Sequence, residues 1–526
     1  MSMNSVYSDL QSRLAGHPRR WETPAEGNGL PYDFALNPLQ ELEIIGSMPQ
    51  VVSADIPSSP LGIGFETLDR DTFDPEKVYP FLKYSGVKRA RCQSGWFKSE
   101  PVVGQYDFAW LDKIVDGLLS IGIQPWLSLS FGHPEYTPCE AYDKAWKDND
   151  NKPPRWGFAR GYVAQVPLYY GEKGINGWKN YVTAVVTHFK DRVNEYEVWN
   201  EPEGFWQYNG KHVKEIGKGT KEIARDYAEF VRITAEAVRT VKPDAKIIAN
   251  FSHTATGYVA EIGKMKIGEI IDIASYHFYG FAPEFMLRER VEHLRANLQI
   301  PGKKLEIWQG ESGCWITRPC PQTEYMQAKY LSRRYLSDLK EGASMSSFFT
   351  VTDFLNYYAN GADQHYGVIN ARENRPKLAF LTMQTMAYLC DGFELAPDLA
   401  ILFTPRNRYN NCSMLPYRVA SAAFRRKGVP VYAVWTPENV DINAPVVDGV
   451  IQIISSEDEF LKNPIVIDPV RSKVAALPRG VIGDHEFTSM TDVGLSEYIN
   501  AQRFLQVPVM DYPLFITDAA IFNELQ

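Results

Sequence analysis

Between residues 61 and 390, short apolar runs of β-favouring residues alternate with longer amphipathic stretches. The runs that predict buried strands are Leu61–Glu66, Val87–Cys92, Gln124–Ser130, Asn194–Trp199, Lys246–Asn250, Ile270–Tyr276, Leu305–Gly310 and Ser344–Val351. The stretches that predict helices are Asp74–Tyr84, Trp110–Leu119, Trp178–Lys190, Ile223–Val241, Phe285–Asn297, Thr323–Lys340 and Lys377–Tyr388. Alternating strands and helices predict an α/β fold with a parallel sheet, and eight strands predict closure into a (β/α)8 TIM barrel.

The pattern changes on both sides of this region. Residues 1–60 contain proline and glycine throughout and are expected to be irregular. Residues 391–526 contain short apolar runs between turn residues, which predict an all-β sandwich. The predicted strands of this part are Val431–Trp435, Gly449–Ile454, Pro464–Ile467 and Leu505–Val509. We therefore expect a catalytic barrel at 61–390 and an accessory sandwich at 391–526, with the segment 1–60 packing against the sandwich.

Composition narrows the class of protein. The net charge of −9 and the pI near 5.6 argue against a nucleic-acid partner, which would require basic patches. No apolar run approaches the length of a membrane span, and Met1–Gly16 lacks the apolar segment of a signal peptide. We therefore expect no membrane partner and a cytoplasmic location, unless a leader has been removed. The six cysteines form no CxxC pair and are expected to be free.

Motifs for cofactors are absent from the sequence. It contains no Walker loop, no GxGxxG after a predicted strand, no HExxH and no zinc-ligand spacing. We therefore expect neither a cofactor nor a metal. Aromatic residues are abundant, with 12 Trp and 29 Tyr. Most of this excess is expected to serve packing, and part of it to provide surfaces on which sugars stack.

Two glutamates end two of the predicted barrel strands. The run Tyr196–Trp199 leads into Asn200-Glu201-Pro202, where the proline stops the strand because it has no N–H to donate. A later run leads through Gly310 to Glu311, which lies 110 residues (311 − 201) beyond Glu201. Barrel chemistry is built at the C-terminal ends of the strands. Two carboxylates at that end are what retaining glycoside hydrolysis requires.

Strand alternation separates the candidates for the second carboxylate. Leu305, Ile307, Gln309 and Glu311 are predicted to share one face of their strand, with Glu306 and Trp308 on the other. Glu306 also lies in the middle of the run, away from the rim of the barrel. The pattern therefore favours Glu311 over Glu306.

With Asn200-Glu201-Pro202 after one strand and Glu311 ending a later one, the chain resembles the clan A glycoside hydrolases, most closely family 39 and its neighbours. The resemblance covers roughly residues 61–390. It implies that Glu201 is the acid/base and Glu311 the nucleophile of a retaining mechanism. One position departs from the clan, which usually has a small hydroxyl residue before the nucleophile, whereas this chain has Gly310.

The resemblance also implies a set of residues around these carboxylates. Asn200 would bind the 2-hydroxyl of the sugar, and Arg91, at the end of the second strand, would lie near the nucleophile, with Arg89 as its rival. Tyr279 would lie beside Glu311, and His277 is an alternative to it or a structural residue. Arg91 and Tyr279 are expected to keep Glu311 ionised, while Glu201 keeps its proton.

Further residues near the predicted strand ends could contact a sugar. His133, on the loop after the third strand, could bind a hydroxyl, and Glu66 and Asp353 could accept hydrogen bonds from hydroxyls. The aromatic residues that could stack on a sugar, with packing as the alternative for each, are Trp96, Trp206, Trp315 and Phe354. A long polar insertion at 137–174 could wall off the cleft.

The function predicted from these features is that of a retaining β-glycosidase acting on short oligosaccharides or small glycosides. An endo-acting glycanase and a transglycosylase would use the same residues. A carbohydrate-binding pseudoenzyme is the alternative outside enzymes, although the presence of both Glu201 and Glu311 argues against it. The expected partner is in each case a carbohydrate.

Overall fold

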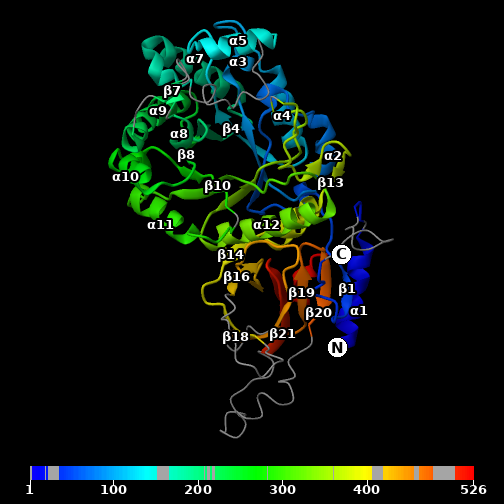
Figure 1. Cartoon of the computed structure of the whole chain (residues 1–526). Coiled ribbons are helices and arrows are strands. Elements are labelled where there is room, and N and C mark those ends of the chain that lie inside the picture. The colour runs from blue at the N-terminus through cyan, green and yellow to red at the C-terminus, as the bar shows by residue number, and fades with distance from the viewer. Residues whose placement is uncertain are drawn as a thin grey trace.

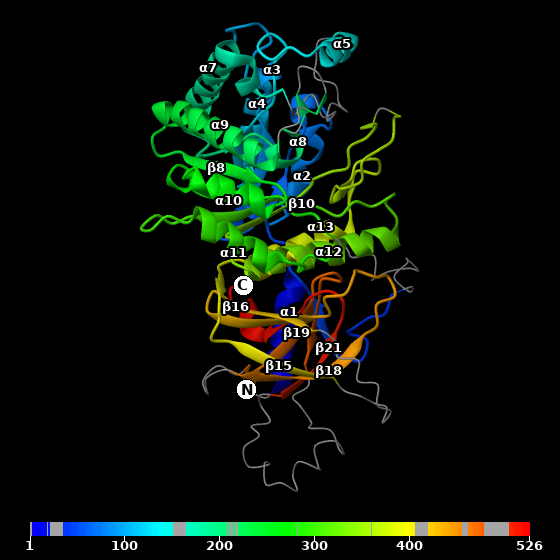
Figure 2. The ribbon, with the colours of Figure 1, turned by 60° about the vertical axis from the view of Figure 1, so that its left-hand side comes forward.

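A computed structural model describes residues 3–525 except 18, 22–34, 151–164, 207, 210–213, 216–218, 281, 359, 406–418, 455–460 and 478–503. A barrel and a β-sandwich lie one above the other (Figures 1 and 2). In this part of the chain, none of the helices combines the length and apolarity needed to cross a lipid bilayer. None of Cys92, Cys139, Cys314, Cys320 and Cys390 is part of a disulfide, as predicted, and Cys412 lies outside the described residues.

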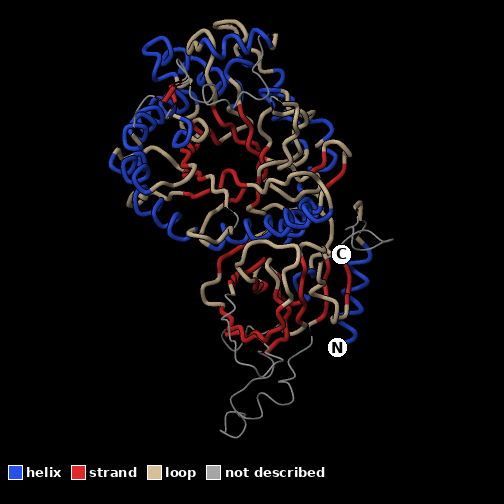
Figure 3. The backbone as a smooth tube through the Cα atoms, viewed as in Figure 1, coloured by secondary structure: helices blue, strands red, loops and turns tan. Residues whose placement is uncertain are grey.

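Eight parallel strands close the barrel, which confirms the predicted fold (Figure 3). They are β2 (Leu61–Gly64), β3 (Arg89–Gln93), β4 (Gln124–Leu129), β5 (Glu195–Val198), β8 (Lys246–Phe251), β9 (Ile273–Tyr276), β10 (Glu306–Ser312) and β11 (Met345–Phe348). Each strand pairs with the next in this order, and β11 pairs with β2 to close the ring. The apolar runs of the sequence form these strands because both faces of a barrel strand are covered.

Helices surround the ring of strands. They are α2 (Tyr79–Leu82), α3 (Trp96–Ser99), α4 (Ala109–Ser120), α5 (Glu140–Asp148), α7 (Gly171–Phe189), α8 (Pro202–Phe205), α9 (Thr220–Val241), α10 (Thr256–Lys264), α11 (Leu287–Leu298), α12 (Pro321–Lys340) and α13 (Leu378–Leu389). Short 3-10 turns lie at 53–55, 68–70, 75–77, 167–170, 267–269 and 519–522. Two small hairpins, β6–β7 (Tyr208–Asn209, Lys214–Glu215) and β12–β13 (Ile369–Asn370, Arg375–Pro376), lie outside the ring.

The interior of the barrel is apolar toward the N-terminal ends of the strands and charged toward their C-terminal ends. The apolar layer consists of Trp126, Ile248, Ile273, Trp308 and Met345, from five different strands. Because these side chains contact one another across the ring, they must point inward. Arg91, Glu197 and His277 follow the layer toward the C-terminal ends of their strands and are completely buried. Buried charges of this kind are stable only when they are paired.

The predicted faces of β10 hold for Ile307 and Trp308 but are wrong for Glu311, which was expected to share the face of Ile307. Trp308 belongs to the apolar layer, while Ile307 packs in the core between strands and helices. The pairing with β11 shifts register between Gln309 and Ser312. A bulge of this kind inserts a residue and reverses the alternation of faces. Glu311 therefore reaches the interior although Ile307 does not.

The sandwich consists of a seven-stranded and a three-stranded antiparallel sheet. The large sheet has the order β1 (Ile44–Ser47), β20 (Lys473–Ala476), β19 (Pro464–Asp468), β22 (Leu514–Asp518), β17 (Val429–Trp435), β16 (Ala420–Arg426) and β14 (Phe393–Leu395). The small sheet has the order β15 (Ala400–Pro405), β18 (Val447–Ile454) and β21 (Phe504–Val509). The predicted strands correspond to β17, β18, β19 and β21.

The N-terminal segment is part of this second body. The expectation of an irregular segment is wrong for residues 3–16, which form helix α1 (Met3–Gly16), and for β1. Ile44 of β1 pairs with Ala475 of β20, and α1 packs on β1, where Leu10 and Leu14 are buried. Figure 1 shows α1 and β1 beside β20, with both chain ends near the sandwich.

Helix α12 lies between the barrel and the sandwich (Figure 1) and is buried on nearly all sides. Its sequence is nevertheless polar, and its buried charges are paired. Lys329 pairs with Asp511 of the sandwich at 2.7 Å, and Arg333 pairs with Glu284 at 2.6 Å. Glu284 also accepts a hydrogen bond from the indole N–H of Trp435 in β17 at 2.7 Å. These contacts join the two bodies across α12.

Candidate active site

Glu201 follows β5 at the C-terminal rim of the barrel. Pro202 begins the short helix α8, so the strand ends before it. The backbone at Glu201 is left-handed, with φ 45° and ψ 52°. For a residue with a Cβ this conformation is strained, and such strain is concentrated at functional sites. The side chain is 18% exposed, so its carboxylate is within reach of a ligand.

Glu311 lies on β10 beyond the bulge and faces the same space. Gly310 occupies the position where the clan usually has a small hydroxyl residue. Its neighbours leave no room for a side chain there. A Cβ at this position would lie 2.0 Å from Oγ of Ser275 and 3.2 Å from Nε2 of His277. Both distances are shorter than ordinary contacts, so a side chain fits only if its neighbours move.

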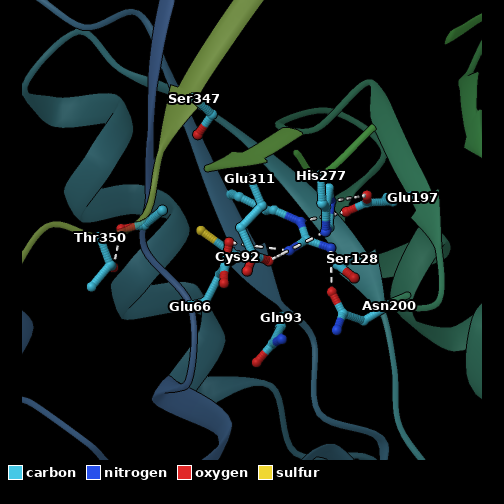
Figure 4. A network of polar contacts seen from close by, with 12 residues as sticks. Glu66, Cys92, Gln93, Ser128, Glu197, Asn200, His277, Glu311, Ser347 and Thr350 are labelled. Atoms are coloured by element: carbon cyan, nitrogen blue, oxygen red, sulfur yellow. Dashed lines mark hydrogen bonds and ion pairs between the residues drawn. The ribbon is translucent and has the colours of Figure 1, made fainter. Parts of the chain in front are cut away.

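Glu66, Glu197, Asn200 and Glu311 converge in the charged half of the barrel (Figure 4), and Arg91 contacts all four. Its Nε donates to Glu197 at 2.6 Å and its Nη2 to Oδ1 of Asn200 at 2.9 Å. Its Nη1 donates to both Glu66, at 3.2 Å, and Glu311. One buried guanidinium thus fixes four side chains from four different strands or loops. Its rival Arg89 lies lower and pairs with Glu195 at 2.9 Å instead.

His277 and Tyr279 extend the site from the end of β9. Nδ1 of His277 lies 3.0 Å from Oε1 of Glu201 and 3.6 Å from Oε2 of Glu311. The hydroxyl of Tyr279 donates to Oε1 of Glu311 at 2.8 Å. Burial raises the pKa of Tyr279 well above its ordinary value, so the phenol keeps its proton and remains a donor. One carboxylate oxygen of Glu201 and one of Glu311 lie within 4.8 Å of each other.

The pKa shifts of the two glutamates run opposite to the expectation. Burial alone would raise the pKa of Glu201, but the hydrogen bond and charge of His277 lower it. Burial raises the pKa of Glu311, and His277 and Arg91 offset this only in part. Burial and Arg91 act to lower the pKa of His277, but the surrounding carboxylates raise it to about 9. The substrate-free site therefore has its readily available proton on His277, beside Glu201.

Three of the predicted sugar-contacting residues lie in the core. Trp96 is fully buried, stacks between Tyr136 and Tyr181 and donates from its indole N–H to Glu100. Trp206 is fully buried among aromatic rings on α9 and neighbouring segments. Nε2 of His133 lies 2.9 Å from the carbonyl oxygen of Glu100, and burial lowers its pKa. For these three residues the prediction of sugar contact is wrong, because strand-end aromatics also pack the loops against the helices.

Other predicted residues lie closer to the site. Trp315 is 52% exposed and lines a cavity next to Tyr279. Glu66 is buried behind Arg91, where burial and the charge of Glu311 raise its pKa to about 8. Asp353 instead forms a buried ion pair with Lys377 at 2.7 Å, and Phe354 is buried among aromatic rings. Most of the insertion at 137–174 that was predicted to wall off the cleft lies outside the described residues or in α5.

Sequence reasoning missed Glu197 and Asn250. Burial acts to raise the pKa of Glu197, but Arg91 and His277 lower it to about 2. Asn250 donates to Glu197 at 2.8 Å, and its amide lies 2.8 Å from Nε2 of His277. The sequence did contain a signal for Glu197. Two arginines alternate on β3 and two glutamates alternate on β5, and they form the ion pairs Arg89–Glu195 and Arg91–Glu197. These residues orient the two cations of the site.

In the described part of the chain, one cluster has the side chains and spacing of a metal site. It consists of Glu201, His277 and Glu311. The surrounding carboxylates raise the pKa of His277 to about 9, so without a ligand this cluster is an acid–base site.

The closed barrel with glutamates at its fourth and seventh strands, together with two sequence matches, makes this chain similar to the clan A glycoside hydrolases. The glycoside hydrolase 42 family model, described as beta-galactosidase, matches residues 71–210, which include Arg91 and Glu201. A beta-xylosidase of Geobacillus stearothermophilus is 29% identical over 111 residues, which is 19% of this chain and 18% of that protein. The chain thus matches about a fifth of this curated relative.

The similarity of solved structures concerns the fold. A family 39 glycoside hydrolase from the gut symbiont Bacteroides cellulosilyticus WH2 superimposes with a TM-score of 0.59 at 16% identity, covering 89% of this chain and 82% of that one. A GH30 endoxylanase from Clostridium papyrosolvens C71 has a TM-score of 0.50 at 11% identity, covering 90% and 97%. Both similarities extend well beyond the barrel region.

Proposed function

We propose that this protein is a retaining β-glycosidase in which Glu311 is the nucleophile and Glu201 is the acid/base. The observation that supports this most is the separation of their carboxylates. Retaining enzymes hold the two groups about 5–5.5 Å apart, and inverting enzymes about 6.5–9.5 Å apart to admit a water molecule. One oxygen of Glu201 and one of Glu311 lie within 4.8 Å of each other, which is the close approach that direct attack by a nucleophile requires.

In the first step, Glu311 attacks the anomeric carbon, and the bond to the leaving oxygen breaks. Arg91 and Tyr279 donate hydrogen bonds to Glu311 and hold the ionised form in place for attack. The Nδ1 proton of His277 passes to Glu201, over 3.0 Å, and from Glu201 to the leaving oxygen, so that His277 becomes neutral and Glu201 is ionised again. A ligand oxygen beside Glu201 therefore draws its proton from His277.

In the second step, Glu201 accepts a proton from water, which attacks the glycosyl-enzyme and releases Glu311. The proton returns to His277, so the enzyme regains its starting state. Asn200, held by Arg91 at 2.9 Å, presents its amide N–H groups toward the site for the sugar's 2-hydroxyl. The proposed substrates are short oligosaccharides or small glycosides, and transglycosylation would follow the same steps with a sugar in place of water.

Trapping with a 2-deoxy-2-fluoro glycoside tests this function. A panel of aryl glycosides first identifies the sugar that the protein cleaves. The fluorinated glycoside of that sugar with an activated leaving group should inactivate the enzyme with time, because fluorine slows both steps and the leaving group speeds only the first. Mass spectrometry of the digested protein should place one label on Glu311, between Trp308 and Trp315. A label on Glu306, or a first product with inverted anomeric configuration by NMR, would contradict the proposal.

A further inference from the structure

A cavity of about 450 Å³ lies next to the nucleophile. Tyr279 is part of its wall, so the cavity begins one side chain away from Glu311. Its barrel side includes Trp315, Tyr330 and Tyr366, and its other side is formed by Asn439 and Val440. The last two belong to the sandwich loop, residues 436–446 between β17 and β18. Both bodies of the protein therefore contribute to this rim cavity.

The sandwich loop is fixed to the barrel on both sides of these two residues. Nζ of Lys329 donates to the carbonyl oxygen of Asp441 at 2.6 Å, and Nη1 of Arg333 donates to the carbonyl oxygen of Glu438. Both cations lie on α12 and are completely buried. A buried cation that loses its acceptors is strongly destabilised, so the two carbonyl groups are held firmly. Asn439 and Val440 are thus positioned by a barrel helix.

The lining of the rim cavity suits a sugar ring. Its volume falls within the range of small-molecule sites, and aromatic walls with few polar groups are typical of such sites. The axial C–H groups of a pyranose pack well on the rings of Trp315 and Tyr366. The amide of Asn439, on an exposed part of the loop, can both donate to and accept from hydroxyl groups. An apolar aglycone would not make use of this amide.

The position of the cavity indicates which part of the substrate it would hold. The leaving group must contact Glu201, which donates the proton. The cavity-lining residues among the described positions come from the ends of β9 and β10, from α12, from the loop after β11 and from the sandwich loop. None of them belongs to β5 or to the segment 199–206 that carries Glu201. A ring in this cavity would therefore lie on the non-leaving side of the cleaved bond.

We propose that the rim cavity binds a second sugar ring on the non-leaving side of the substrate, and that the sandwich loop, through Asn439 and Val440, forms one wall of this subsite. The inference rests on the proposed glycosidase function. It makes the sandwich part of the substrate-binding cleft, with Lys329 and Arg333 as positioning residues. The favoured substrates are then glycosides whose non-leaving part contains at least two sugar units.

Kinetics on two aryl glycosides with the same leaving group test this subsite. One substrate is the 4-nitrophenyl glycoside of the monosaccharide that the enzyme prefers, and the other is that of the corresponding disaccharide. Asn439→Ala should reduce kcat/KM on the disaccharide substrate about five- to tenfold more than on the monosaccharide substrate, mostly through KM, since it removes a hydrogen bond to the additional ring. Val440→Trp, which fills the cavity, should cause a larger selective loss.

Asn443→Ala provides the matched control. Asn443 is exposed on the same loop, does not line the cavity, and should leave both rates unchanged. Equal losses on the two substrates, or no loss with both variants, would overturn the subsite while leaving the glycosidase function intact. If the unaltered enzyme cleaved neither substrate for any sugar tested, the proposed function itself would fail.

Discussion

In the proposed mechanism, His277 connects the carboxylates of Glu201 and Glu311 through one proton. It lies 3.0 Å from Glu201 and 3.6 Å from Glu311, and it lowers the pKa of both. Activity requires an ionised Glu311, so the rate should fall as the pH drops through the raised pKa of this group. Activity also requires the proton of His277, so the rate should fall again as the pH rises through about 9.

His277→Asn should narrow the pH profile of kcat/KM from both sides. Without the imidazolium, the pKa of Glu311 rises further, which moves the acidic limb to higher pH. The basic limb moves to lower pH, because Glu201 must then supply the proton alone. Steady-state rates from pH 4 to 10 measure both limbs.

Tyr279→Phe is the matched control for this profile. It removes only a hydrogen bond that lowers the pKa of Glu311, so it should move the acidic limb upward and leave the basic limb in place. An unchanged basic limb in His277→Asn would show that His277 is not the source of the proton.

At the scale of single residues, sequence alone could locate the carboxylates but not every partner. Glu201 and Glu311 stood out because each ends an apolar run. Trp96 and Trp206 follow strand ends, which is also where an aromatic residue that stacks on a sugar would lie. Only their burial in the structure reveals that they pack the core. Glu197 was missed because a charged residue within a strand can point to either side, and its partner Arg91 is distant in sequence.

At the scale of elements, the bulge in β10 shapes the site most. Gly310 lies within it, and a Cβ there would meet Ser275 on the neighbouring strand β9. The strands themselves could be predicted from apolar runs. The bulge could not, because it depends on how β10 pairs with β11 and not on any pattern within β10.

Gly310→Ala should lower the free energy of unfolding by about 1–3 kcal/mol, because the added methyl group overpacks the barrel. The cost should be smaller in a Ser275→Ala background, where the nearest atom is absent. Urea unfolding of the wild type, both single variants and the double variant measures this coupling.

Gly257→Ala is a control for the added methyl group, since nothing lies within 4 Å of its Cβ position in α10. It should be neutral or slightly stabilising, because alanine favours helices. Strictly additive effects of Gly310→Ala and Ser275→Ala would show that the two positions do not clash.

At the scale of the whole molecule, the barrel and the sandwich share buried charges. Lys329 and Arg333 of α12 have their acceptors in the sandwich at Asp511 and in the sandwich loop. In addition, β1 has its partner strand in β20. The sequence indicated the two bodies because strands and helices alternate in one and short strands follow one another in the other. The contacts between the bodies could not be predicted, because they join residues more than 100 positions apart.

A fragment ending at Asp391 should be insoluble when it is expressed alone. It would expose α12, in which Lys329 has lost its acceptors at Asp441 and Asp511 while Arg333 keeps Glu284, and it would leave β1 without its partner. The soluble fraction and the activity of the expressed fragment measure this. The same fragment with Lys329→Met should be more soluble, since Lys329 is then no longer an unpaired charge on α12. A soluble and active fragment without this substitution would show that the barrel is independent.

The pairing of β1 with β20 also has a consequence for how the chain is made. Ile44 leaves the ribosome 431 residues (475 − 44) before its partner Ala475. At roughly 5–20 residues per second, synthesis leaves β1 without a partner for about 20–90 s. All eight barrel strands are synthesised within this interval. During translation, β1 therefore has an unpaired edge while the barrel strands are being synthesised. A chaperone that binds unpaired strand edges could bind β1 throughout this interval.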